Sequence, residues 1–436
     1  MPRRTHRILC RFGFLTFCLL PTLLVVGWII NERVIEGSPS PAAEAAARPL
    51  AEAELSRLLG LKVTLERISY PQRGVTLLEN VTIADPETGG RIAAVPALEM
   101  AKTERGLELI ATRPEIDAER WRLLWESLHD RVLRERGEII SPTHLTARQA
   151  TLVSDRPARS PSFSDVEIRL ASGSAAIEFR VAGAESPQRV KFQAKRERSA
   201  TPPYTRWELH TGESTLPCTL FADRLPWLAR LGAGCGFNGS LWAEQAPGGW
   251  RGELTGRFID VDLDRLVSEQ FPHKLSGSGE VTFSRLEFEG GRIRQAAGWL
   301  DAGPGTISRG LLAGGLETFA LRSNTLQDVK TLSRYARLAF GFEMDEVGVR
   351  LSGACDPEGT LLMLEDDPKA RLLDRHAHVT PIAALVRMLA PANEVQVPAA
   401  KETDALLRIL PLPPIKRPEP VADAEPQARV RLLENR

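Results

Sequence analysis

The chain has 436 residues, enough to bury a full hydrophobic core and to form about two or three domains. Its content of 43% hydrophobic and 26% charged residues is that of an ordinary globular protein. Basic and acidic residues both number 56, so the net charge is zero. A nucleic-acid-binding protein is therefore not indicated, because such proteins usually show a basic excess or stripe.

An apolar stretch without a charge covers residues 12–30, long enough for a helix to cross the roughly 30 Å hydrocarbon core of a bilayer. Four basic residues precede it: Arg3, Arg4, Arg7 and Arg11. The positive-inside rule then places residues 1–11 in the cytoplasm and the body on the far side of the membrane. The alternative is a cleaved signal peptide with a site near Ala42. The apolar run is longer than a typical signal-peptide core, which favours an uncleaved anchor.

Residues 31–140 are expected to form a mixed α and β region. A helix is predicted over residues 42–59, ended by Gly60, because apolar side chains form a stripe there. Beyond it the period changes to two, with Leu61, Val63 and Leu65 alternating with polar residues, a pattern typical of short antiparallel strands. A second amphipathic helix is predicted over residues 121–132.

Residues 141–325 are expected to form a β-rich groove region. Apolar and charged residues alternate along several segments, as in an antiparallel sheet buried on one face, and no βαβ alternation occurs. The predicted apolar groove face consists of Ile177, Phe179, Val181, Val190, Phe192, Trp207 and Leu209. The fold class expected is mainly β with flanking α: an extended, curled, groove-like antiparallel sheet behind one N-terminal transmembrane helix.

Residues 326–410 are expected to form a C-terminal α and β region, and residues 411–436 a disordered tail rich in proline and charge. Apolar residues at helical spacing predict three helices, over residues 326–338, 382–389 and 406–410. A loose internal repeat also appears: a strand, an aspartate, a short apolar helix and then often a glycine. Its aspartates include Asp117, Asp223 and the run ending in Asp262, and an aspartate after a strand can cap the following helix.

The sequence shows no recognisable catalytic, cofactor or metal motif. Asp260, Asp262 and Asp264 form an alternating run, but the glycine and later glutamate of a calcium loop are not in register. His376 and His378 have few potential ligands nearby and are expected in an exposed loop. No catalytic residue, cofactor or metal is therefore assigned, and a non-enzymatic protein is expected.

The chain has five cysteines and no pair at C-x-x-C spacing, so a zinc or redox motif is not indicated. Cys218 and Cys235 can pair in an oxidising compartment and leave Cys355 free. The alternative is that all three are small buried hydrophobic residues.

Several segments resemble AsmA-like bacterial envelope proteins: 59–63 (LGLKV), 78–86 (LENVTIADP), 256–263 (GRFIDVDL) with 275–277, and 291–293 with 298–300 and 305–308. The resemblance implies an inner-membrane anchor, a periplasmic sheet curled into an apolar groove, and a role in phospholipid transport or outer-membrane upkeep. The partners expected are the membrane, phospholipid and other envelope proteins. The alternative function is a secretion-apparatus or envelope scaffold that binds protein, and an envelope hydrolase would lack a recognisable nucleophile or metal site.

Overall fold

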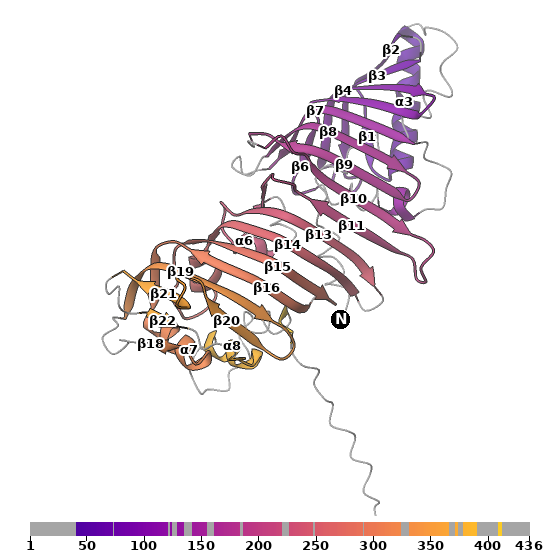
Figure 1. Ribbon diagram of the computed structural model, residues 1–436. Helices are drawn as coiled ribbons and strands as arrows, with labels where there is room; N and C mark the ends of the chain where they lie inside the picture. Colours follow the sequence, from indigo (N-terminus) through magenta and orange to yellow (C-terminus); the bar gives the residue numbers. More distant parts are fainter. Residues whose placement is uncertain are drawn as a thin grey trace, which may run out of the picture.

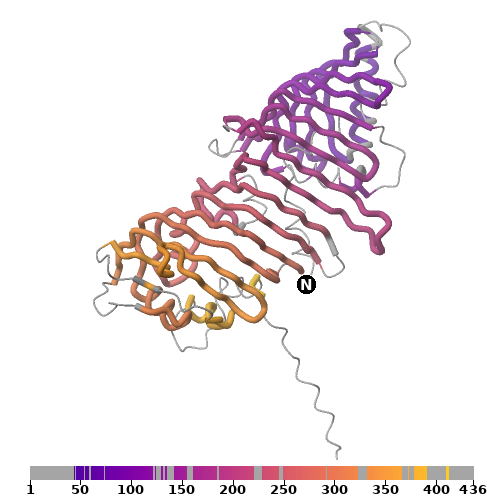
Figure 2. Tube along the Cα trace, in the orientation of Figure 1, coloured from indigo at the N-terminus to yellow at the C-terminus, as the bar shows by residue number. Residues whose placement is uncertain are grey.

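A computed structural model describes residues 41–72, 74–120, 123, 129–134, 142–154, 161–183, 186–219, 226–246, 249–290, 292–323, 331–365, 371–373, 378–389 and 409–411. These residues build one 22-stranded sheet, which curls from its indigo N-terminal end to its orange and yellow C-terminal end (Figures 1 and 2). The predicted anchor at 12–30 and the tail beyond Pro411 lie outside these residues. Within them, no helix has the length and apolar character needed to span a bilayer.

The strands follow one another closely along the chain. The first half of the sheet contains β1 (Lys62–Thr64), β2 (Arg67–Gln72), β3 (Val75–Ala84), β4 (Arg91–Thr103), β5 (Gly106–Thr112), β6 (Glu115–Asp117), β7 (Thr143–Val153), β8 (Ser162–Ala171), β9 (Ser174–Val181), β10 (Val190–Glu197) and β11 (Tyr204–His210). The second half contains β12 (Leu216–Pro217), β13 (Gly236–Ala246), β14 (Gly249–Asp262), β15 (Ser278–Glu289), β16 (Arg292–Ala302), β17 (Gly305–Ser308), β18 (Arg322–Ser323), β19 (Leu332–Met344), β20 (Val349–Gly353), β21 (Thr360–Leu364) and β22 (Arg371–Leu373).

Helices precede, interrupt and follow the strands along the chain. They are α3 (Pro41–Leu59), α6 (Pro226–Ala229), α7 (Arg309–Thr318) and α8 (Ile382–Leu389), with two π-helical segments, η1 (His129–Arg134) and η3 (Asp264–Ser268). The helices predicted over residues 42–59 and 382–389 are confirmed as α3 and α8. The predicted helix over 121–132 lies mostly outside the described residues, which include Leu123, in helical conformation, and the end of the helix as part of η1.

The sheet is antiparallel except at one place. β7 pairs in parallel with both β5 and β6, through Leu107 opposite Thr143 and Glu115 opposite Thr151. A parallel pair needs a crossover connection, and the segment between β6 and β7, which contains η1, supplies it. The expectation of a wholly antiparallel sheet is therefore corrected at β7. The single sheet also runs through the boundaries expected near residues 140 and 325.

The helix predicted over residues 326–338 is wrong in its described part, because residues 332–344 form the strand β19. The apolar spacing of three between Leu332, Tyr335 and Leu338 suggested a helix. In the sheet Leu332 is 52% exposed on the other side of the strand. Tyr335 and Leu338 both pack against the core because the register with β21 shifts between Tyr335 and Arg337, so that the alternation restarts one residue later.

Helices cover both ends of the sheet. At the first end, Ser56 Oγ of α3 accepts a hydrogen bond from the Val63 amide at 2.9 Å, and Glu52 Oε1 accepts one from the Leu65 amide at 2.7 Å. At the other end, α7 and α8 pack together beside β20 (Figure 1). A second hydrophobic cluster forms there from Phe319, Val349, Ile382, Val386 and Leu410. Covered ends limit edge-to-edge pairing with other sheets.

Candidate functional site: the inner face of the sheet

One row of cross-strand neighbours runs along the sheet from β3 to β20, and each member is the register partner of the next. The row consists of Thr76, Met100, Leu109, Leu145, Ile168, Ile177, Phe192, Leu209, Leu241, Leu254, Leu286, Ala296, Met344 and Val349. Except for Thr76, every member is apolar. We call the side of the sheet that carries this row the inner face.

The structure places all seven residues of the predicted groove face on the inner face. Phe192 lies between Ile177 and Leu209 in the row, and Val190 lies opposite Phe179. Six of the seven are buried, with exposed fractions from 0% for Ile177 to 7% for Phe179, and Val181 is partly buried. The inner face is therefore closed at these strands.

The segment η1 closes this part of the inner face. Leu133 is fully buried, and the ring of His129 stacks on Trp207 with centroids 6.1 Å apart. Trp207 in turn stacks on Phe192 at 6.0 Å. His129 Nε2 also lies 3.3 Å from Thr205 Oγ1. Burial lowers the pKa of His129 below its ordinary value, so the neutral imidazole is the form that fits this site.

The inner face changes character beyond β11. From β13 to β20 many of its large apolar side chains are only partly buried. We call these residues the half-exposed stretch: Leu241, Phe283, Leu286, Phe288, Leu300, Phe340 and Phe342. Leu241 and Leu286 are members of the row. Phe288, Leu300, Phe340 and Phe342 lie an even number of residues from a row member on the same strand, and Phe283 is the register partner of Gly298, two residues from Ala296. None of them belongs to the predicted groove face, although Phe340, Phe342 and Met344 alternate in the same way at the end of β19.

Glycines lie between the aromatic rings of this stretch. Phe283 pairs with Gly256 on one side and Gly298 on the other, and Gly298 pairs with Phe342. A Cβ on Gly298 would lie 1.9 Å from the carbonyl oxygen of Thr282, so only glycine fits. The rings of Phe283 and Phe342 meet edge to face across the gap, with centroids 5.7 Å apart.

The contacts between aromatic rings continue from Phe283 into the buried core. Phe258 contacts Phe283 edge to face at 6.1 Å, and Phe237 contacts Phe258 at 5.0 Å. Phe237 and Phe258 are each 6% exposed. The series of aromatic contacts therefore leads from the buried core to the half-exposed stretch, and no polar side chain separates these rings.

The outer face carries charge. Glu167 lies there beside His144, Arg169 and Arg189, with His144 Nε2 at 2.9 Å and Arg189 at 2.9 Å from its carboxylate. Burial alone would raise the pKa of Glu167, but hydrogen bonds from these three side chains outweigh it and lower the pKa to about 2. The contrast between the two faces indicates that the outer face meets water along these strands.

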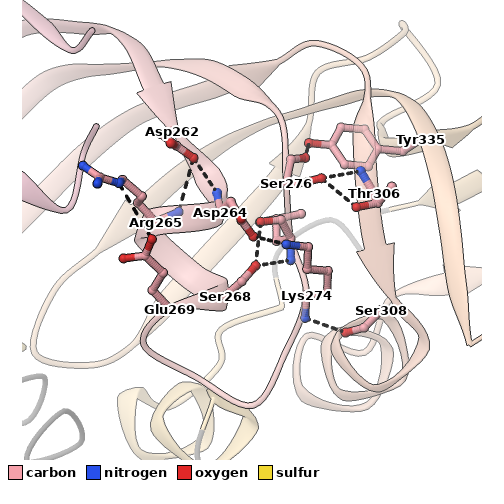
Figure 3. Close-up of polar contacts among 11 residues, drawn as sticks. Asp262, Asp264, Arg265, Ser268, Glu269, Lys274, Ser276, Thr306, Ser308 and Tyr335 are labelled. Atoms are coloured by element: carbon pink, nitrogen blue, oxygen red, sulfur yellow. Dashed lines mark hydrogen bonds and ion pairs between the residues drawn. The ribbon is translucent and has the colours of Figure 1, made fainter. Parts of the chain in front are cut away.

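The three aspartates at the end of β14 lie in different local settings, and Figure 3 shows the contacts of Asp262 and Asp264. Asp262 Oδ1 accepts hydrogen bonds from the amides of Asp264 at 3.0 Å and Arg265 at 3.2 Å. Asp264 forms an ion pair with Lys274, which lowers the pKa of its carboxyl. Asp260 has a φ of 54° at a register shift of β14. The described residues contain no group of three or more His, Cys, Asp or Glu placed to hold a metal.

The contacts of the loop that contains Ser276, near this aspartate run, also have structural roles. The buried Tyr335 hydroxyl donates to the Ser276 carbonyl oxygen at 2.6 Å, as Figure 3 shows, and burial raises its pKa to about 12. Of the two candidate histidines, His378 is exposed before the bridge of Thr380 to Val349, and His376 lies outside the described residues. Since the contacts of these polar residues are structural, the main candidate for a functional surface is the half-exposed stretch.

Comparison with protein-family models, with curated proteins and with solved structures found no match to this chain.

Proposed function

We propose that this chain is a membrane-anchored envelope protein whose body lies in the periplasm and whose half-exposed stretch holds the acyl part of a phospholipid. The observation that carries the proposal is the continuous apolar inner face, closed from β3 to β11 and partly exposed from β13 to β20. Clustered apolar side chains left partly open to water are a common mark of an interaction surface. The uncharged segment at 12–30 and the resemblance to AsmA-like proteins support the location and the ligand class.

The energetics of acyl binding suit a surface of this kind. Each methylene removed from water contributes about 0.8 kcal/mol, so a chain that covers only part of the half-exposed stretch would still be held. Phe283 and Phe342 present aromatic rings toward the same side, with their centroids 5.7 Å apart. Such a surface suits an extended apolar ligand better than a compact polar one.

Site-specific photo-crosslinking in living cells tests the lipid. A benzophenone amino acid replaces Phe342 on the inner face, and in the control it replaces Trp299, which is 48% exposed on the opposite face of the neighbouring strand. We expect labelled phospholipid to attach after illumination at position 342 and not at position 299. Equal labelling at both positions would contradict a lipid site on the inner face.

The same experiment addresses a second function. The inner face over β9 to β11 is filled by the chain's own His129 and Leu133, which favours a scaffold that binds protein. A scaffold predicts protein adducts of higher mass, and no lipid, at position 342.

The location is tested separately. An alkaline phosphatase domain fused after residue 40 should be active, because that enzyme folds only outside the cytoplasm. An inactive phosphatase fusion, together with an active cytoplasmic reporter at the same position, would refute the proposed topology.

A further inference from the structure

Cys218 and Cys235 lie face to face between two paired strands. Cys218 follows β12 directly and Cys235 precedes β13, and these strands pair through Leu216 with Phe237 and Pro217 with Gly236. The next opposed pair in this register is Cys218 with Cys235, and the Cys218 amide donates to the Cys235 carbonyl oxygen at 2.8 Å. Opposed residues of an antiparallel pair have Cα atoms about 4.5–5.5 Å apart. A disulfide spans that separation.

The two thiols are also each other's nearest polar partners. Their Sγ atoms lie 2.9 Å apart, and both side chains are 1% exposed. The hydrogen bond between them, and then burial, raise the pKa of the Cys218 thiol, so the folded pair does not hold a reactive thiolate. A metal is not the better explanation, because the described residues contain no third ligand grouped with the pair.

We propose that Cys218 and Cys235 form a structural disulfide in the exported protein. The oxidant is a disulfide of the thiol–disulfide oxidoreductase class. One cysteine thiolate attacks that disulfide and forms a mixed disulfide, and the second thiolate displaces the oxidant's thiol. The protein loses two protons and two electrons, and the oxidant is reduced to its dithiol. Because burial disfavours the thiolate, the exchange precedes burial of the pair during folding.

The bond would link the two ends of the segment between Cys218 and Cys235, which contains α6. Within that segment Leu228 is 2% exposed and Leu231 is 8% exposed, so it contributes to the core. The Leu231 carbonyl oxygen accepts a hydrogen bond from the Asp262 amide at 2.8 Å, which fixes the segment to the end of β14. A covalent bond between the two ends of this segment restricts the unfolded chain and helps to hold the contact between Leu231 and Asp262.

The inference is tested on the full chain purified in detergent. The protein is reduced, partly unfolded, oxidised with glutathione disulfide, refolded, and treated with an alkylating agent before digestion with trypsin without reductant. The two cysteines lie on different tryptic peptides, 207–224 and 231–251, and Cys355 lies on a third, 351–369. We expect the first two peptides to be linked and to separate on reduction, with Cys355 alkylated. Alkylation of both Cys218 and Cys235, or a link from either one to Cys355, would overturn the proposal.

Thermal unfolding gives a second readout. Dithiothreitol should lower the unfolding midpoint of the oxidised protein by several degrees. A double variant, Cys218→Ser with Cys235→Ser, should unfold at a lower temperature that dithiothreitol does not change, while Cys355→Ser should keep the full response. An equal response of the double variant would also overturn the proposal.

The proposal rests on the proposed export of the body, because the cytoplasm keeps thiols reduced. The same peptide mapping, applied to protein taken from cells after acid quenching, distinguishes the proposed disulfide from the proposed export. Linked peptides in that protein agree with both proposals. If the pair links with glutathione disulfide but is fully alkylated in the protein from cells, the disulfide site stands and the proposed export fails.

Discussion

The imidazole of His129 lies stacked on the indole of Trp207, with ring centroids 6.1 Å apart, and this contact joins η1 to the inner face of the sheet. Trp207 continues the stack onto Phe192. The three rings hold the segment after β6 against strands β10 and β11, which are far away along the chain. The stack helps to close the inner face over β10 and β11.

The stack should be sensitive to pH. Burial lowers the pKa of His129 in the fold, whereas the unfolded chain keeps the ordinary value of about 6.5. Below pH 6.5 the unfolded chain therefore binds more protons, and the free energy of unfolding should fall as the pH drops through the folded pKa. Urea denaturation at pH 7 and pH 5 should show this loss.

A His129→Gln variant provides the control, since glutamine does not titrate. Its stability should change less between pH 7 and pH 5 than that of the wild type. Glu167 contributes little to the difference between pH 7 and pH 5, because the stability that its lowered pKa provides is lost mainly below its unfolded pKa of 4.5. An unchanged slope in the variant would show that His129 is not the titrating group.

A charge on the inner face should have different effects in its two parts. Phe192 is 4% exposed under the ring of Trp207, so Phe192→Asp buries an unpaired carboxylate and should cost about 3 kcal/mol or more. Phe342 is partly exposed, so Phe342→Asp keeps its charge near water and should cost about 1–2 kcal/mol. Thermal melting of the two variants makes the comparison. Equal losses would mean that the half-exposed stretch is as closed as the rest.

The alternation of Val190 and Phe192, and of Trp207 and Leu209, was sufficient to predict which side chains share a face. Strand side chains have a period of two, and the local sequence carries that period. The strand β19 escaped prediction because the register shift after Tyr335 breaks the period and imitates a helix. A local pattern cannot report a shift that depends on a distant partner strand.

The burial of the predicted groove face was not predictable for a related reason. Nothing in the alternation around Phe192 reveals that His129 covers Trp207, because Thr205, the partner of His129, lies 76 residues further along the chain. The parallel pairing of β7 has the same origin. Long-range contacts decide which part of an apolar face is covered, and so the sequence located the inner face but not its half-exposed stretch.

The glycine between the two phenylalanine rings should be irreplaceable. A methyl group at Gly298 would meet the Thr282 carbonyl oxygen at 1.9 Å, so Gly298→Ala should destabilise the protein by about 2–3 kcal/mol. Gly315 in α7 offers a matched control, because a Cβ there meets nothing within 4 Å. Gly315→Ala should be neutral or stabilising by up to about 1 kcal/mol. Denaturant midpoints measure both, and a neutral Gly298→Ala would refute the close approach of the strands.

Two aspartates of the loose repeat have the same local geometry. Asp117 ends β6 and its Oδ1 accepts hydrogen bonds from the amides of Glu119 at 2.8 Å and Arg120 at 3.1 Å. Asp262 ends β14 and accepts from the amides two and three residues further on in the same way. Both aspartates therefore satisfy backbone donors at the start of a turn or helical segment. The third aspartate of the repeat, Asp223, lies outside the described residues.

This shared geometry makes a specific prediction about substitutions. Asp262→Ala and Asp117→Ala should each destabilise the protein by about 1 kcal/mol, because each leaves two backbone amides without their acceptor. Asparagine keeps a side-chain oxygen at the same place, so Asp262→Asn and Asp117→Asn should recover most of that loss. Urea denaturation of the four variants measures the differences. If asparagine were as damaging as alanine at both positions, the negative charge rather than the cap would explain the aspartates, and the repeat would lose its structural basis.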